Sequence, residues 1–155
     1  MANRGFGPSI AVHSVRLMYC LAAVITLLAG ITIYVFFRNV SNLVLFRFFP
    51  KPGFLTGLPL LVNTGNFAMY GLVFQGPHIL WLLSGLFFIR SIWLTQKKQS
   101  QIYIAIFTTI AIANEFSQLS HNIPGTFDVR DVLSYGITAF VESVLYHHFI
   151  FRRIK

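Results

Sequence analysis

The sequence has few charged residues and almost no acidic ones. Asp and Glu number 4 among 155 residues, and the first 114 positions hold none of them. Charged residues make up 10% of the chain, against about 25% in a typical soluble domain. Hydrophobic residues make up 55%, which a soluble fold of this size is unable to bury, whereas lipid covers them in a membrane protein. The composition therefore predicts a polytopic membrane protein.

Cysteine is scarce too, and the basic residues do not indicate a nucleic-acid partner. The single Cys20 excludes an intramolecular disulfide, and we interpret it as a small residue within an apolar run. Most Lys and Arg residues stand at the ends of apolar runs, where they anchor helices in headgroups, and they form no stripe interleaved with aromatics. The sequence has no P-loop, GxSxG, HExxH or CxxC motif, so it does not support soluble-enzyme catalysis.

Apolar runs along the chain are long enough to form membrane-spanning helices, which need about 20 residues each. We predict an all-α fold with a single transmembrane domain over 1–155, a helical bundle with spans at about 15–37, 76–95, 101–119 and 131–151. The first run is too long for a signal peptide and has no cleavage site, so we expect it to be retained. Prolines, asparagines and glycines at about 39–75 indicate an interfacial or re-entrant segment. A topology with five spans, in which this segment also crosses the membrane, is an alternative.

The basic residues also predict an orientation, because cytoplasmic helix ends carry more Lys and Arg. With four spans and a cytoplasmic N-terminus, seven basic residues lie inside and four outside. The inner set is Arg4, Arg16, Lys97, Lys98, Arg152, Arg153 and Lys155, and the outer set is Arg38, Arg47, Lys51 and Arg130. Five spans would move the N-terminus outward. Both topologies place the C-terminus in the cytoplasm and the 119–130 loop on the extracytoplasmic side.

Three of the four acids gather around that loop, in 114-NEFSQLSHNIPGTFDVRD-131. Glu115 lies on the last turns of the third span, where a carboxylate is paired, functional, or hydrated at headgroup level. Gln118 shares its helix face at the i+3 position. Asp128 has the position of an N-cap and Asp131 follows in the first turn, where an acid complements the helix dipole. Capping and a functional role are compatible for both aspartates.

The order Glu115-Phe116-Ser117-Gln118, then Gly125-Thr126-Phe127-Asp128-Val129-Arg130-Asp131, then Gly136, resembles the VanZ-like family of small polytopic membrane proteins. The match is confined mainly to residues 114–143. Gly125-Thr126 stands where many relatives carry Arg, and 62-VNTGNFAMYG-71 lacks a charge that is usual before the second span. The resemblance implies a protein of the bacterial cell envelope, located in the cytoplasmic (inner) membrane, with a lipid-linked or amphiphilic envelope component as its ligand.

We therefore expect an outward-facing polar site that binds or processes an amphiphile. The expected substrate-binding residues are Glu115, Gln118, His121, Asp128, Arg130 and Asp131, of which Glu115, Asp128 and Asp131 are also catalytic candidates. A helix N-terminus and a cation suit an anion such as phosphate, whereas the carboxylates repel it. We expect no cofactor. A divalent cation on Asp128 and Asp131, with Glu115 and a substrate phosphate, is an alternative.

Two further polar residues lie within or beside the spans. Glu142 is about 16 Å along the helix from the first turn of the fourth span, near mid-membrane. It is either a proton site or, as we favour, a buried partner of Ser84, Thr108 or Thr109, and it is protonated if no cation is near. His78 follows a Gly-Pro pair, a position compatible with simple capping of a helix.

Three functions are compatible with these features. The first is the envelope protein described above, surrounded by membrane lipids. The second is a non-catalytic accessory or structural subunit of a larger membrane complex, with other membrane subunits as partners, because the chain is small and holds no complete catalytic set. The third, a channel or proton-coupled carrier using Glu115 and Glu142, has the least support because so few internal charges make a poor pathway. The sequence does not decide whether the protein is an enzyme.

Overall fold

The computed structural model describes residues 8–37, 71–119 and 127–151, and every regular element among them is a helix. The α-helices are α1 (Pro8–Phe37), α4 (Gly76–Ile92), α5 (Lys97–Leu119) and α6 (Val129–Leu145). Two π-helical segments adjoin them, η3 (Gly71–Gln75) before α4 and η4 (Tyr146–Phe151) after α6. The all-α prediction is therefore confirmed for the described residues. Most of the predicted interfacial segment lies outside them.

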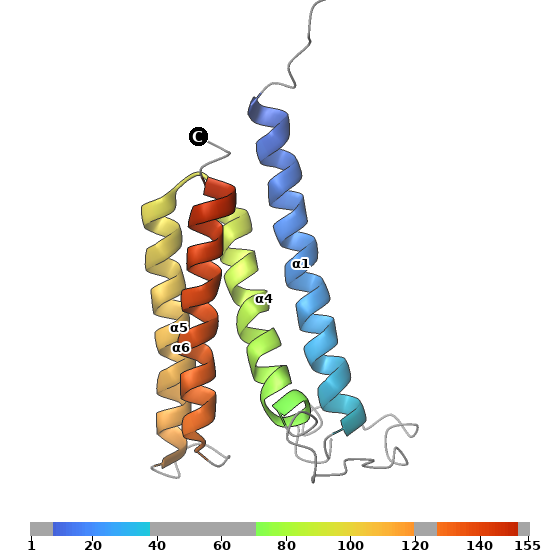
Figure 1. The fold of residues 1–155 in the computed structure, drawn as a ribbon, viewed down its shortest axis with the longest axis vertical. Coiled ribbons are helices and arrows are strands. Elements are labelled where there is room, and N and C mark those ends of the chain that lie inside the picture. The colour runs from blue at the N-terminus through green and yellow to red at the C-terminus, as the bar shows by residue number, and fades with distance from the viewer. Residues whose placement is uncertain (1–7, 38–70, 120–126, 152–155) are drawn as a thin grey trace, which may run out of the picture.

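Consecutive α-helices run antiparallel, as Figure 1 shows. α4, α5 and α6 pack together, and α1 leans against α4. At the lower end of Figure 1, α1 and α5 end while α4 and α6 begin. The turn between α4 and α5 lies at the opposite end. Segments far apart in the sequence therefore meet at each end of the bundle.

Within the described residues, three helices are long and apolar enough to cross a membrane: Val12–Phe37, Gly71–Ile92 and Lys97–Leu119. α6, with 17 residues, is not among them. Large apolar side chains point outward from all four α-helices, as at Ile25, Phe88, Ile110 and Phe140. Such a surface is unusual for a monomeric protein in water, and lipid covers it at no cost. These features support the predicted membrane protein.

The second span begins earlier than the sequence indicated. The prediction placed residues 71–75 in the interfacial segment, but Gly71–Gln75 continues into α4 as one helical stretch with Val73 buried. Pro77, which has no backbone N–H to donate, lies where the π-helical turn gives way to α-helix. This continuity places His78 inside a long helix rather than at its start.

Two hydrophobic clusters form the bundle core in the described part of the chain, and glycine lets two helices approach closely. One cluster, between α4, α5 and α6, contains Leu82, Leu86, Ile104, Ala111 and Tyr135, and the other contains Tyr19, Leu94 and Tyr146. At Gly85 of α4, a Cβ atom would overlap the ring of Phe107 on α5. Small residues commonly allow such close packing between membrane helices. The tight contact fixes how α4 and α5 face each other.

Candidate functional site

Glu115 is a buried carboxylate near the end of α5, with only 3% of its surface exposed. It is the last member of a buried stripe on one face of this helix, spaced three or four residues apart: Ser100, Ile104, Thr108, Ala111 and Glu115. Its Oε2 atom is buried and accepts no hydrogen bond from any residue that the structure describes. An ionised carboxylate in this position needs a cation or a donor from elsewhere, because burying an uncompensated charge is costly.

Asp131 and His78 lie beside this carboxylate and contact each other. Oδ2 of Asp131 is 3.1 Å from Nδ1 of His78, and 7% of the Asp131 surface is exposed. The imidazole stacks on the ring of Tyr135, with a centroid distance of 6.3 Å and an interplanar angle of 19°. This stacking holds the plane of the imidazole. The sequence left open a capping role for His78, but Gln75 is the N-cap residue of α4 and His78 contacts Asp131.

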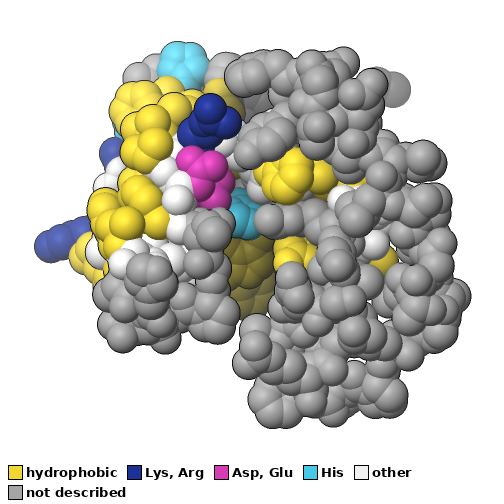
Figure 2. Space-filling model, turned by 90° about the horizontal axis from the view of Figure 1, so that it is seen from below, with side chains coloured by type: hydrophobic (Ala, Val, Ile, Leu, Met, Phe, Trp, Pro, Cys, Tyr) yellow, Lys and Arg dark blue, Asp and Glu magenta, His cyan; other side chains and the backbone are white. Residues whose placement is uncertain are grey.

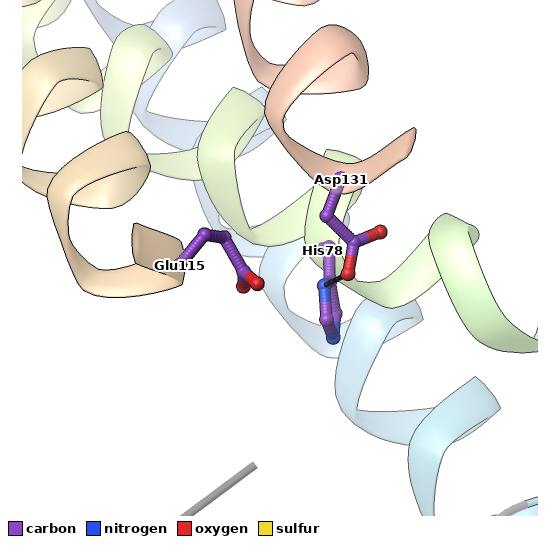
Figure 3. Close-up of side chains that lie close together, drawn as sticks. All are labelled: His78, Glu115 and Asp131. Atoms are coloured by element: carbon purple, nitrogen blue, oxygen red, sulfur yellow. Dashed lines mark ion pairs between the residues drawn. The ribbon is translucent and has the colours of Figure 1, made fainter. Parts of the chain in front are cut away.

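The three side chains converge from three helices at the lower end of the bundle. One ligand atom each from His78 (α4), Glu115 (α5) and Asp131 (α6) lies within 4.8 Å of the others. In the close-up of Figure 3, the Glu115 carboxylate points toward the His78–Asp131 pair. Figure 2, seen from this end, shows an acidic side chain between a basic side chain and a histidine, with hydrophobic side chains nearby. We call these three residues the His–Glu–Asp site.

A pocket of about 480 Å³ adjoins the site. His78, Asn114, Glu115 and Gln118 give it a polar side, while its apolar and aromatic walls are Leu27, Gly30, Ile31, Tyr34, Val35, Pro77, Trp81 and Tyr135. Residues of α1, α4, α5 and α6 all contribute to this lining. Pockets that bind small molecules commonly combine mostly apolar walls with a few converging polar groups.

The start of α6 explains how Asp131 comes to face inward. Asp128 has an extended backbone (φ −129°, ψ 118°), and its Oδ1 accepts a 2.8 Å hydrogen bond from the backbone N–H of Arg130. Its carbonyl accepts a 3.0 Å bond from the backbone N–H of Asp131. The predicted N-cap is thus confirmed. This cap begins the helix so that Asp131 and Tyr135, four residues apart, share the buried face.

Of the other expected site residues, some line the pocket and others lie outside it. Gln118 lines the pocket beside Glu115. Asp128 is a helix cap outside both the pocket lining and the His–Glu–Asp site, and Arg130 is exposed. His121 lies outside the described residues. A role of these residues in binding a substrate stays a prediction, as does the cation site on Asp128 and Asp131.

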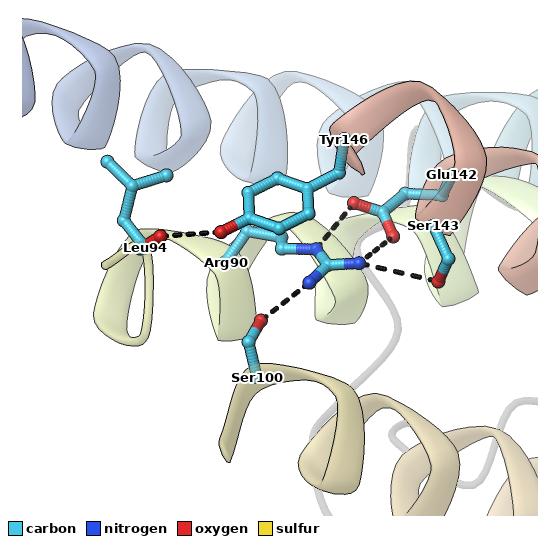
Figure 4. A network of polar contacts seen from close by, with 6 residues as sticks. All are labelled: Arg90, Leu94, Ser100, Glu142, Ser143 and Tyr146. Atoms are coloured by element: carbon cyan, nitrogen blue, oxygen red, sulfur yellow. Dashed lines mark hydrogen bonds and ion pairs between the residues drawn. The ribbon is translucent and has the colours of Figure 1, made fainter. Parts of the chain in front are cut away.

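A second polar cluster lies toward the other end of the bundle, around Arg90 of α4 (Figure 4). Arg90 is fully buried, and its Nε and Nη2 atoms donate to the two carboxylate oxygens of Glu142 at 2.9 and 3.0 Å. Nη1 donates to Ser100 of α5 at 2.8 Å, and Nη2 also donates to Ser143 at 3.3 Å. The guanidinium lies 3.7 Å over the ring of Tyr146, a cation–π contact.

The structure corrects the expectation for Glu142. We expected it to pair with Ser84, Thr108 or Thr109, or to be a proton site, but it forms an ion pair with Arg90. Arg90 was not named as a candidate. One signal does point to it: an Arg within an apolar run requires a counter-charge. The described spans hold few acids that meet this need.

Comparisons of the chain with protein-family models, curated proteins and solved structures found no match. The functional argument therefore proceeds from the residues and their geometry.

Proposed function

We propose that this protein binds an amphiphile in the membrane, with its headgroup at the His–Glu–Asp site and its chain in the adjoining pocket. One observation carries the proposal. The Oε2 atom of the buried Glu115 carboxylate accepts no hydrogen bond from the described residues, and Glu115 lies in the wall of a pocket of about 480 Å³. A ligand with a polar head and an apolar chain complements both parts of this pocket.

The two ends of such a ligand meet different surfaces. Leu27, Ile31 and Val35 of α1 and Trp81 of α4 provide a wall for hydrocarbon. Because a lipid chain is already in an apolar phase, this wall contributes through van der Waals packing and shape rather than by removing methylene groups from water. The few polar groups on the opposite side give orientation and selectivity. Since the pocket is formed between helices, a lipid chain reaches it without leaving the apolar phase.

The proposal places the protein in a bacterial inner membrane as a VanZ-like protein of the cell envelope, on the strength of the Glu115–Asp131 sequence pattern. The antiparallel order in Figure 1 supports four spans, because α1 ends at the end where α4 begins. Five spans would make α1 and α4 parallel. Lys97 and Lys98 lie at the opposite end from the His–Glu–Asp site, which supports a cytoplasmic α4–α5 turn and an extracytoplasmic site.

Fluorescence quenching tests amphiphile binding directly, because Trp81 lines the pocket. The chain contains two tryptophans, and Trp93 stacks on Tyr103. A Trp93→Phe variant in phosphatidylcholine nanodiscs therefore reports on Trp81 alone. The probes are two single-chain amphiphiles brominated on the chain, one with a phosphate and one with a glucoside headgroup. We expect saturable quenching by at least one probe, and at least tenfold weaker affinity after Glu115→Gln.

The matched control is Asp128→Asn, which alters a carboxylate at the same end of the bundle but outside the proposed site. Asn caps a helix about as well as Asp, so α6 keeps its start. Quenching that rises linearly without saturation for both probes overturns the proposal, and so does an equal loss of affinity in both variants. If no amphiphile binds and the protein instead purifies as part of a larger native complex, the accessory-subunit function is favoured.

A further inference from the structure

We propose that the His–Glu–Asp site holds a divalent transition-metal ion, with Zn²⁺ as the best fit. The protein ligands are a ring nitrogen of His78 and one carboxylate oxygen each of Glu115 and Asp131. The open coordination position accepts an anionic oxygen, such as that of a phosphate headgroup. Metal binding stands independently of amphiphile binding, and only the identity of the headgroup rests on the proposed function.

The spacing of the ligand atoms fits a metal ion. Zn²⁺ binds nitrogen and oxygen at about 2.0–2.2 Å, so tetrahedral ligand atoms lie about 3.3 Å apart. Nδ1 of His78 and Oδ2 of Asp131 are already 3.1 Å apart, and all three ligand atoms lie within 4.8 Å of one another. Metal binding would then require the Glu115 carboxylate to move closer to the other two ligand atoms.

The Glu115 carboxylate gives independent support for a ligand. Glu115 exposes only 3% of its surface, and its carboxylate points toward the other two side chains. Its Oε2 atom accepts no hydrogen bond from the described residues. A His–Asp ion pair by itself would leave this atom unsatisfied. A metal ion satisfies it and at the same time neutralises two carboxylates that lie close together.

The donor set decides which metal fits. Ca²⁺ takes six to eight oxygen ligands, and Mg²⁺ prefers oxygens and water, whereas imidazole suits ions such as Zn²⁺. One nitrogen and two carboxylates from the protein form a three-ligand set that leaves a position open for a further ligand. The ligands also come from three helices, and Tyr135 supports the imidazole through its ring, so the helix packing orients them before metal binds.

The metal also determines the class of headgroup. With a neutral imidazole, two ionised carboxylates give the site a charge that repels phosphate. A divalent ion cancels this charge and offers a Lewis-acidic position toward the pocket, because two of the ligands, His78 and Glu115, line it. The site then favours an anionic oxygen over the amine or sugar headgroups that bare carboxylates would accept.

Metal titration of the full-length protein in detergent tests the site. After treatment with a chelator, Zn²⁺ is added in competition with a chromophoric indicator. We expect one Zn²⁺ per chain in the wild type and in Asp128→Asn, and at least tenfold weaker binding in Glu115→Gln and His78→Ala. Absence of stoichiometric binding to the folded wild-type protein overturns the inference, as does equal binding by wild type and Glu115→Gln.

Two further measurements guard against misfolded variants and separate the two proposals. His78→Cys exchanges one metal ligand for another, and with Co²⁺ it should add a thiolate-to-cobalt charge-transfer band that the wild type, which already contains Cys20, lacks. Zn²⁺-loaded protein should bind dodecyl phosphate at least tenfold more tightly than metal-free protein. Inorganic phosphate binding as tightly as dodecyl phosphate would identify a free anion as the ligand, which retains the metal site and contradicts the proposed function. Equal dodecyl phosphate binding with and without Zn²⁺ would retain the proposed function and contradict the inference that the metal ion binds the headgroup.

Discussion

Arg90 and Glu142 are 52 positions apart in the sequence and form a bidentate ion pair in the bundle, with nitrogen-to-oxygen distances of 2.9 and 3.0 Å. Charged groups in an apolar interior have a large desolvation cost, which is offset only when geometry is good and remaining donors are satisfied. The geometry meets the first condition, and Ser100 and Ser143 accept from the same guanidinium, so four of its five N–H groups have acceptors among these residues. The pair joins α4 to α6, and Ser100 brings in α5.

Removing one partner of this pair should destabilise the protein strongly. Arg90→Met or Glu142→Leu leaves the other charge buried, at a cost of about 3–5 kcal/mol in the free energy of unfolding. The double variant removes both charges, so its loss should be much smaller than the sum of the single losses. Denaturant unfolding of all four proteins in detergent, followed by circular dichroism, measures this coupling. Additive losses would show that the ion pair is not a unit.

Ser100 should contribute to the same network through its single hydroxyl. It is fully buried and accepts from Nη1 of Arg90 at 2.8 Å. Ser100→Ala leaves a charged donor unsatisfied and should reduce the free energy of unfolding by about 1–3 kcal/mol. Ser91→Ala is the matched control, since the hydroxyl of buried Ser91 donates to the Phe88 carbonyl within its own helix. The same unfolding experiment should show a smaller loss there.

The sequence was sufficient to predict the helices but not their partners. The apolar runs predicted the approximate positions of the four α-helices. In lipid, backbone N–H and C=O groups must form hydrogen bonds within the protein, and few structures other than helices allow this. Asp128 was identifiable as an N-cap from its position alone. η3 was missed because Gly71–Gln75 is bordered by turn-forming residues, and π-helical turns have no clear sequence signal.

The polar sites required knowledge of the packing. On α4, His78 and Arg90 are twelve positions apart on one inward face with buried Leu82 and Leu86 between them. α6 carries Asp131 and Glu142 on its own buried face. Which of these residues pair depends on the direction and rotation of each helix, and sequence periodicity does not give the relation between helices. Glu115 was therefore identified while its neighbour His78 was not.

Because α4 packs closely against α5, we expect alanine substitutions at Gly85 and Gly136 to differ in their effect on stability. At Gly85 a Cβ would overlap Phe107, whereas at Gly136 of α6 it would meet no atom of another described helix within 4 Å. Gly85→Ala should therefore destabilise by about 1–3 kcal/mol, as overpacking does. Gly136→Ala should be neutral or slightly stabilising, since alanine favours helix. Thermal unfolding in detergent compares them, and equal shifts would contradict the α4–α5 packing.

Tyr135 should support metal binding without being a ligand. Its ring stacks on the His78 imidazole at 6.3 Å and is itself 5% exposed, so it restricts the imidazole orientation. Groups that orient a metal ligand typically change affinity about 10–100-fold when removed. Tyr135→Leu should weaken Zn²⁺ binding within that range, whereas Tyr135→Phe keeps the ring and should bind nearly as well as wild type.

The Zn²⁺ titration of these two variants distinguishes orientation of the imidazole from general loosening of the bundle. Both variants are first checked for helix content by circular dichroism and for stability by denaturant unfolding. If Tyr135→Leu weakens Zn²⁺ binding while His78→Cys in the same background still shows its cobalt band, the ring acts on the imidazole itself. If Tyr135→Phe weakens binding as much as Tyr135→Leu, the hydroxyl rather than ring stacking supports the site, and the stacking argument is wrong.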